Sequence, residues 1–244
     1  VPVARLNELA AALPAQPDTP WTLCVLMGDD LQADARRLAD FEAEHRGRFT
    51  ADVVELRASD VERIALAGRT FGDNRGVAVY VELPYVDDPR ELLVAVKQAG
   101  LRAKVRTGGV TGDAFPTAAQ LARFIARCAA AGVPFKATAG LHHPLRGEHR
   151  LTYRPDAPSA TMFGFLNVFI AAAMANSGVA EGELVDVLEE RDAAAFTFTE
   201  RELRWRERSI PLARIQQTRE ALATAFGSCS FREPVDELQE LARP

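Results

Sequence analysis

The chain has 244 residues, of which 48% are hydrophobic and 26% are charged, a composition typical of a globular protein large enough for one sizeable domain. Its 29 basic and 34 acidic residues give a formal net charge of −5 and form no basic region, which argues against nucleic acid and anionic membrane as partners. Three cysteines without metal-type spacing argue against a disulfide framework or a structural zinc site, and they predict a cytoplasmic protein.

No apolar run reaches the roughly 18 residues that a membrane span needs, and the most apolar segment, residues 162–174, is predicted to be a buried helix. Residues 1–3 lack the basic and apolar regions of a signal peptide. We expect them to be the tail of a strand whose beginning lies upstream of this sequence.

Extended apolar runs alternate with helical patterns along the chain. Strands are predicted at residues 1–3, 22–27, 52–57, 77–83, 102–107, 134–139, 194–199 and 226–231. Helices are predicted at residues 4–13, 31–45, 59–67, 89–99, 117–131, 160–177 with 181–190, 210–225 and 233–242. Each predicted strand is therefore followed by a helical segment.

This alternation predicts an α/β fold, and eight strands favour a closed (β/α)₈ TIM-type barrel formed by residues 1–244 as a single domain. An open doubly wound sheet is the alternative. The glycine-rich motifs that mark nucleotide-binding open sheets are absent from the sequence, which favours the barrel.

Charged residues lie near the ends of four predicted strands. Side chains two residues apart share a face of a strand, so Glu55 and Arg57 face away from Val54 and Leu56. The inward set on this view is Glu55, Arg57, Glu82, Lys104, Arg106, Lys136 and Thr138. Because barrel active sites lie at the carboxyl ends of the strands, we predict one shared site in which Lys136, Glu82 and Glu55 are catalytic. The alternative is a network of ion pairs that fills the barrel.

A basic cluster within this set predicts the charge of the substrate. Arg57, Lys104 and Arg106 are suited to binding carboxylate or phosphate, and Gly108 and Gly109 would let backbone N–H groups approach the same anion. We therefore expect a small phosphorylated or carboxylated metabolite. A simple turn is the alternative for the two glycines.

The long loop at residues 140–159 begins with two adjacent histidines. We expect His142 or His143 to transfer protons, since imidazole titrates near neutral pH. A metal ion bound by one of them with Glu55, Glu82 or His149 is the alternative, although the spacing does not favour it and no cofactor is predicted. Asn167 and Ser228 are further candidates for substrate contact, with a buried structural amide as the alternative for Asn167.

The segment Lys136-Ala137-Thr138-Ala139-Gly140 resembles the Lys-Thr-Ser-Thr-Gly stretch of deoxyribose-phosphate aldolase and related class I aldolases. The resemblance implies that Lys136 forms an imine and that Lys104 corresponds to the second lysine those enzymes keep nearby. The chain departs from that family in its two consecutive histidines and in having no clear copy of the catalytic aspartate.

Taken together, the patterns predict an enzyme, a lyase of the class I aldolase type, that acts on a small anionic carbonyl compound through Lys136. Two alternatives stay open: a barrel that binds an anionic metabolite without turnover, and a metal-dependent hydrolase or lyase using His142, His143 and carboxylates. A homo-oligomer is compatible with the sequence.

Overall fold

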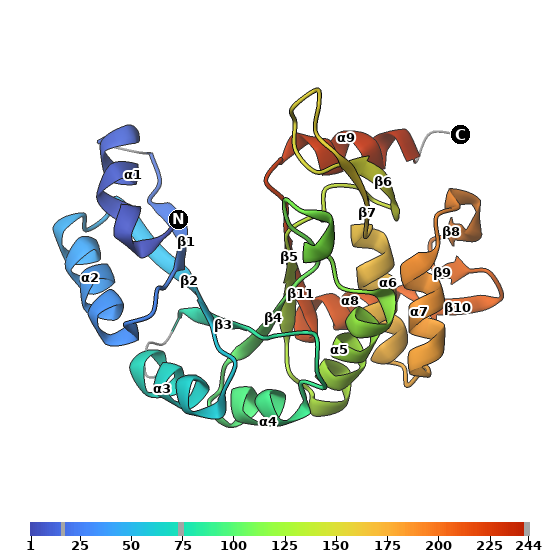
Figure 1. Cartoon of the computed structure of the whole chain (residues 1–244), viewed down its shortest axis with the longest axis horizontal. Coiled ribbons are helices and arrows are strands. Elements are labelled where there is room, and N and C mark those ends of the chain that lie inside the picture. The colour runs from blue at the N-terminus through green and yellow to red at the C-terminus, as the bar shows by residue number, and fades with distance from the viewer. Residues whose placement is uncertain (16–17, 73–75, 242–244) are drawn as a thin grey trace. The chain divides into compact units, whose positions relative to one another are not determined.

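The computed structural model describes residues 1–15, 18–72 and 76–241 (Figure 1). The chain divides into two compact units. Unit 1 comprises Val1–Leu83 and Glu91–Ala103, and unit 2 comprises Pro84–Arg90 and Lys104–Pro244. Across the described residues, no helix is both long and apolar enough to cross a membrane.

The main sheet has six parallel strands in the order β1-β2-β3-β4-β5-β11. Their bounds are Trp21–Leu26 (β1), Phe49–Arg57 (β2), Ala78–Glu82 (β3), Arg102–Arg106 (β4), Phe135–Thr138 (β5) and Ala223–Gly227 (β11). The predicted alternation of strands and helices in an α/β fold is confirmed. The closed eight-stranded barrel is wrong, because β1 and β11 end the order and do not pair with each other in the described part of the chain.

Two predicted strands explain the difference in count. In residues 1–3, Pro2 makes only an isolated bridge to Leu26, and Val3 already begins the 3₁₀ helix η1 (Val3–Arg5). Proline has no N–H to offer a ladder, which accounts for the short pairing. Residues 196–198 do form a strand, β8 (Phe196–Phe198), but it belongs to a separate antiparallel sheet.

Unit 1 contains the first three strands, one helix that precedes them and three helices of which one follows each strand. These helices are α1 (Leu6–Ala12), α2 (Leu31–Glu44), α3 (Val61–Phe71) and α4 (Arg90–Gln98). In the parallel register Val54 lies beside Val79 and Leu56 beside Val81, and all four are buried. Glu55 and Arg57 therefore share the other face of the sheet with their neighbours in register, as the alternation predicted.

Unit 2 contains β5, β11 and five α-helices. The helices are α5 (Ala118–Ala131), α6 (Phe165–Ala175), α7 (Glu181–Glu189), α8 (Leu212–Ala221) and α9 (Arg232–Leu241). The ring of Phe124 on α5 contacts Phe135 edge-on with 5.8 Å between centroids, so the buried residues of β5 face this helix. The predicted helix at residues 233–242 corresponds to α9, and Ala242 lies outside the described residues.

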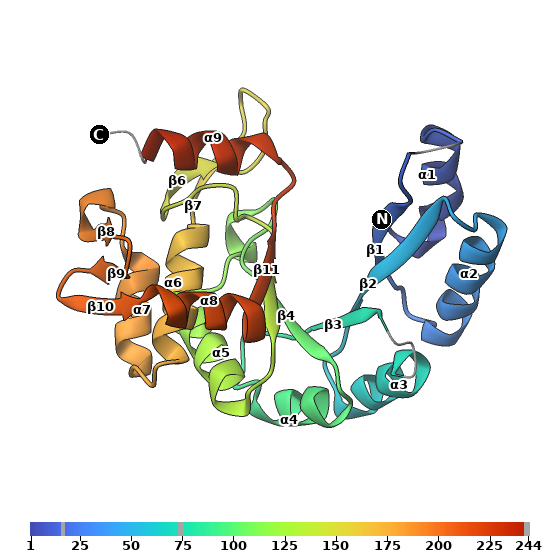
Figure 2. The ribbon, with the colours of Figure 1, turned by 180° about the vertical axis from the view of Figure 1, so that it is seen from behind.

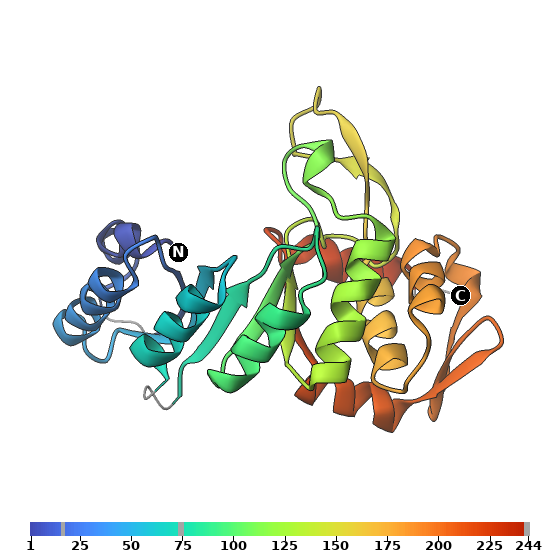
Figure 3. The ribbon, with the colours of Figure 1, turned by 60° about the horizontal axis from the view of Figure 1, so that its bottom comes forward.

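Two antiparallel insertions in unit 2 escaped the sequence analysis. β6 (Gly147–Arg150) pairs with β7 (Ser159–Met162), and β9 (Glu202–Trp205) pairs with β8 and with β10 (Arg208–Pro211). Helices were predicted over β7 and over part of β10, because residues such as Ala160 and Ile210 fit either periodicity over so short a span. Figure 3 shows the β6–β7 hairpin extending from one end of unit 2.

Candidate functional site

The predicted site residues are divided between the two units. Glu55, Arg57 and Glu82 belong to unit 1, whereas the remaining candidates belong to unit 2. That all of them form one site therefore stays a prediction.

In unit 1 the two buried glutamates have partners on neighbouring strands. Arg57 Nε lies 2.9 Å from Glu82 Oε1, and the thiol of Cys24 donates to Glu55 Oε1 over 3.1 Å. Glu55 is 6% exposed and Glu82 9% exposed. Burying a carboxylate is costly unless it is paired, so these contacts are consistent with a structural ion pair as well as with a site.

In unit 2, Lys136 and Thr138 share one face of β5. They alternate with Phe135 and Ala137, each of which is 1% exposed on the helix-covered face. In the parallel register Lys136 lies beside Ala225 and Thr138 beside Gly227, so the neighbouring positions on β11 carry the smallest side chains.

The hydroxyl of Thr138 is an unsatisfied polar group. Its Oγ1 atom is buried and has no hydrogen-bond partner among the described residues. A buried hydroxyl usually has a partner, and leaving one unpaired costs about 1 to 3 kcal/mol. The Thr138 hydroxyl at the end of β5 therefore has hydrogen-bonding capacity that no described protein group uses.

The carboxyl ends of β4 and β5 lie side by side. The backbone N–H of Thr107 donates to Thr138 O over 2.8 Å, and its hydroxyl donates to Ala139 O over 2.6 Å. Lys104 and Arg106 alternate with the fully buried helix-facing positions of β4, and Lys104 is itself only 7% exposed. The two cations thus share a face near the end of this strand.

The two glycines after β4 have a packing role. A Cβ atom at Gly108 would lie 2.4 Å from the ring of Phe115, and one at Gly109 would lie 2.7 Å from Ala114 Cβ. Arg106 Nη2 reaches the carbonyl oxygen of Gly108 at 3.5 Å. This geometry favours the turn that closes over Phe115, and anion binding by these backbone groups stays a prediction.

His142 and Ser228, both predicted site residues, are in contact. The Nδ1 atom of His142 lies 2.8 Å from Ser228 Oγ, which itself accepts the N–H of Ser230. We assign the Ser228 hydroxyl as the donor to Nδ1. Burial lowers the pKa of His142, which favours the neutral imidazole required by this arrangement. Cys229 Sγ lies 3.7 Å from Nε2 of the same ring.

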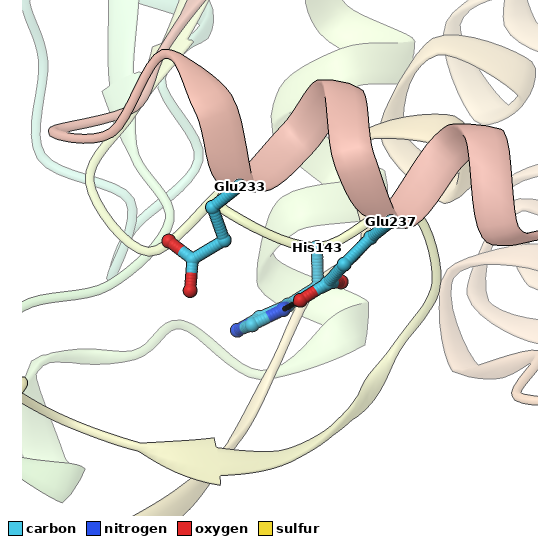
Figure 4. A group of neighbouring side chains, drawn as sticks. All are labelled: His143, Glu233 and Glu237. Carbon is cyan, nitrogen blue, oxygen red and sulfur yellow. Dashed lines mark hydrogen bonds and ion pairs between the residues drawn. The ribbon is translucent and has the colours of Figure 1, made fainter.

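His143 lies against two carboxylates of α9 (Figure 4). Its Nδ1 atom is 2.8 Å from both carboxylate oxygens of Glu237. Glu233, one helical turn earlier, completes a group whose candidate ligand atoms all lie within 4.8 Å of one another. The sequence analysis missed both glutamates, although their spacing of four residues in a predicted helix places them on one face.

His149 of β6 completes the histidine cluster. Its ring stacks on His143 with 3.3 Å between centroids, and Figures 1 and 2 both show α9 next to the hairpin that carries it. Burial lowers the pKa of His149 to about 4, and the adjacent His143 contributes in the same direction. His149 is therefore neutral at physiological pH.

The position of His143 is fixed by the start of α6. The carbonyl oxygens of His143 and Pro144 accept the N–H groups of Phe165 and Leu166, both over 3.0 Å. The approach is so close that a Cβ atom at Gly164 would lie 2.4 Å from the carbonyl oxygen of Pro144. These contacts supply the first turn of α6 with acceptors that no side chain provides.

Asn167 holds the same loop from inside the core. Its side-chain oxygen accepts the N–H of Arg146, and its amide donates to the carbonyl oxygens of Val187 and Glu190. The residue is fully buried. These contacts favour the structural role for Asn167, while substrate contact stays a prediction.

The sequence matches no protein-family model and no curated protein sequence. Function is therefore argued from the residues of unit 2 themselves. Two features stand out there: the Lys136 face of β5, and the group formed by His143, Glu233 and Glu237, which could hold a metal ion.

Proposed function

We propose that the protein is a lyase that forms an imine between Lys136 and a small carbonyl compound bearing phosphate or carboxylate. The observation that supports this most directly is the face shared by Lys136 and Thr138. The small residues Ala225 and Gly227 lie beside them in register, and the Thr138 hydroxyl has no partner among the described residues.

Imine formation needs a nucleophilic amine. It also needs a hydrogen bond to the oxygen of the substrate carbonyl, which leaves as water. In the proposed reaction the Nζ amine of Lys136 adds to the carbonyl carbon to give a carbinolamine, and loss of water gives the imine. In this proposal the Thr138 hydroxyl, which has no partner among the described residues, donates a hydrogen bond to the carbinolamine oxygen.

The bond between the α and β carbons of the protonated imine then breaks, and its electron pair forms the enamine while the β-hydroxyl group loses its proton to a general base and becomes the second carbonyl group. Protonation of the enamine at the α carbon and hydrolysis of the resulting imine release the first product and regenerate Lys136.

The charge of the substrate follows from β4. Lys104 and Arg106 share one face of the strand whose end adjoins β5, which supports an anionic group on the substrate. We retain Arg57, Glu55 and Glu82 as predicted members of this site. We also retain proton transfer by His142 or His143, and each of these roles needs its own test.

The sequence makes the imine unusually easy to locate, because the chain contains only three lysines, Lys97, Lys104 and Lys136. The full chain is incubated with small aldehydes and ketones, with and without phosphate or carboxylate groups, and then reduced with borohydride. We expect a stable mass increase on the peptide containing Lys136, and greater labelling by the anionic compounds.

Matched variants decide the assignment. Lys136→Arg keeps the positive charge but cannot form an imine, so it should lose the label, whereas Lys97→Arg, at an exposed position of α4, should keep it. Lys104→Arg should also keep it. The proposal fails if no carbonyl compound labels the protein, or if the label maps to Lys97 or Lys104.

A further inference from the structure

The group formed by His143, Glu233 and Glu237 has an excess of negative charge. Within the described residues, the basic side chains that approach the two glutamates are His142, 3.6 Å from Glu233, and His143, 2.8 Å from Glu237, and neither glutamate pairs with arginine or lysine. Their carboxylate oxygens lie within 4.8 Å of each other. Like charges at this separation repel, and a bound cation would relieve the repulsion.

The three side chains converge on a common point, as Figure 4 shows. His143 reaches it from the loop after β5, while Glu233 and Glu237 reach it from one face of α9. A metal ion about 2.0 to 2.2 Å from each of two donors holds those donors roughly 3 to 3.5 Å apart. The 2.8 Å between His143 Nδ1 and the Glu237 oxygens would have to widen only slightly.

We infer that His143, Glu233 and Glu237 form a binding site for one divalent first-row transition-metal ion, with Zn²⁺ and Mn²⁺ as the best matches. An imidazole ligand disfavours Mg²⁺ and Ca²⁺, which prefer oxygen donors throughout. Two carboxylates without a thiolate disfavour Cu⁺. Three protein ligands leave at least one coordination position for water or another small molecule.

Neighbouring residues hold the ligands in place. The hydroxyl of Tyr153 donates to Glu233 Oε2 over 2.9 Å, and the ring of His149 stacks on His143. Hydrogen bonds of this kind orient carboxylate ligands, and their loss commonly weakens metal binding 10- to 100-fold. The ligands are therefore already oriented by contacts outside the group itself.

The test is calorimetric titration of Zn²⁺ and of Mn²⁺ into the full chain after treatment with a chelator. We expect one ion per chain. Glu237→Gln keeps the size of the side chain but removes its charge, and it should weaken binding at least about a hundredfold. Tyr153→Phe should weaken binding about tenfold. Asp236→Asn and Glu240→Gln alter exposed neighbours on α9 and should leave the affinity unchanged within about twofold.

Two outcomes would overturn the inference. If the wild-type chain binds neither ion, or if Glu237→Gln binds as tightly as Asp236→Asn does, the group consists only of histidine–glutamate ion pairs. Equal affinity for Mg²⁺ and Mn²⁺ would overturn the assigned class of ion.

The inference does not depend on the imine. Lys136→Arg should bind the ion as the wild type does, and Glu237→Gln should still be labelled by borohydride if the imine forms.

Discussion

Two carboxylate sites of unit 2 differ in how many hydrogen-bond donors surround them: one is the single carboxylate of Glu190, and the other is the pair formed by Glu233 and Glu237. The carboxylate of Glu190, which is 8% exposed, accepts N–H groups from Arg191, Asp192, Trp205 and Arg206. One carboxylate thus has four N–H donors. The ordinary acceptor capacity of its two oxygens is filled by the protein itself.

The carboxylates of α9 show the opposite balance. Within the described residues, Glu233 accepts from Tyr153 and lies 3.6 Å from His142, and Glu237 faces His143. Two carboxylates therefore share fewer donors than Glu190 has alone. The number of hydrogen-bond donors around a buried or half-buried carboxylate therefore distinguishes two roles. A carboxylate whose acceptor positions are all occupied by protein donors stabilises the fold, whereas one with unoccupied acceptor positions can bind a ligand.

The largest expected change in the free energy of unfolding comes from removing the side-chain amide of Asn167, which links the two carboxylate sites. Asn167 links the loop carrying His143 to the backbone carbonyl of Glu190. Asn167→Ala would remove two buried hydrogen bonds and one partly buried one and would leave a cavity, so we expect a loss of about 3 to 4 kcal/mol in the free energy of unfolding, measured with urea. If stability is unchanged and only substrate binding falls, Asn167 is a substrate-binding residue.

A matched pair of substitutions tests the comparison itself. Glu190→Gln would place the NH₂ group of an amide, itself a donor, against N–H donors that the carboxylate now accepts. We expect this to lower the free energy of unfolding by about 2 kcal/mol. Most of this loss would come from the backbone donors and Trp205, because Arg206 is 59% exposed. Glu237→Gln should cost less than about 1 kcal/mol, and equal losses in the two variants would contradict the distinction.

The pH dependence of stability gives a smaller, directional effect. Burial by itself raises the pKa of Glu190, but the donors of Asp192, Arg206 and Trp205 outweigh it and hold the pKa below its ordinary value of 4.5. A lowered folded-state pKa adds stability above the unfolded pKa, and this contribution is lost as the pH falls through the folded value. The stability difference between wild type and Glu190→Gln should be constant above about pH 6 and shrink below about pH 4.5. A difference that grows on acidification would be incompatible with this reading.

Periodicity predicted the repeating part of the fold well. Strands β1 to β5 and helices α2 to α5 lie close to their predicted bounds, because each has a clear apolar face. In α3 the side chain of Asp60 also caps the first turn by accepting the N–H of Arg63. Closure into a barrel could not be predicted in this way. It depends on which strands pair, and the sequence of a strand such as β8 does not show whether it joins a parallel or an antiparallel sheet.

For the candidate site, local pattern identified the residues of single strands and missed what distant segments bring together. Lys136 and Thr138 share a face as the period of two requires. Glu233 and Glu237 were overlooked because nothing within α9 itself distinguishes them from the other acidic residues of a solvated helix. Only the path of the loop after β5, fixed by the start of α6, brings His143 to them.

The separation of 94 residues between His143 and Glu237 has a consequence for biosynthesis. A ribosome completes His143, the hairpin and α6 well before it adds α9. During that interval the imidazole of His143 has neither carboxylate opposite it. A chain that ended before α9 would therefore contain the sequence of every strand of the main sheet but neither acidic partner of His143.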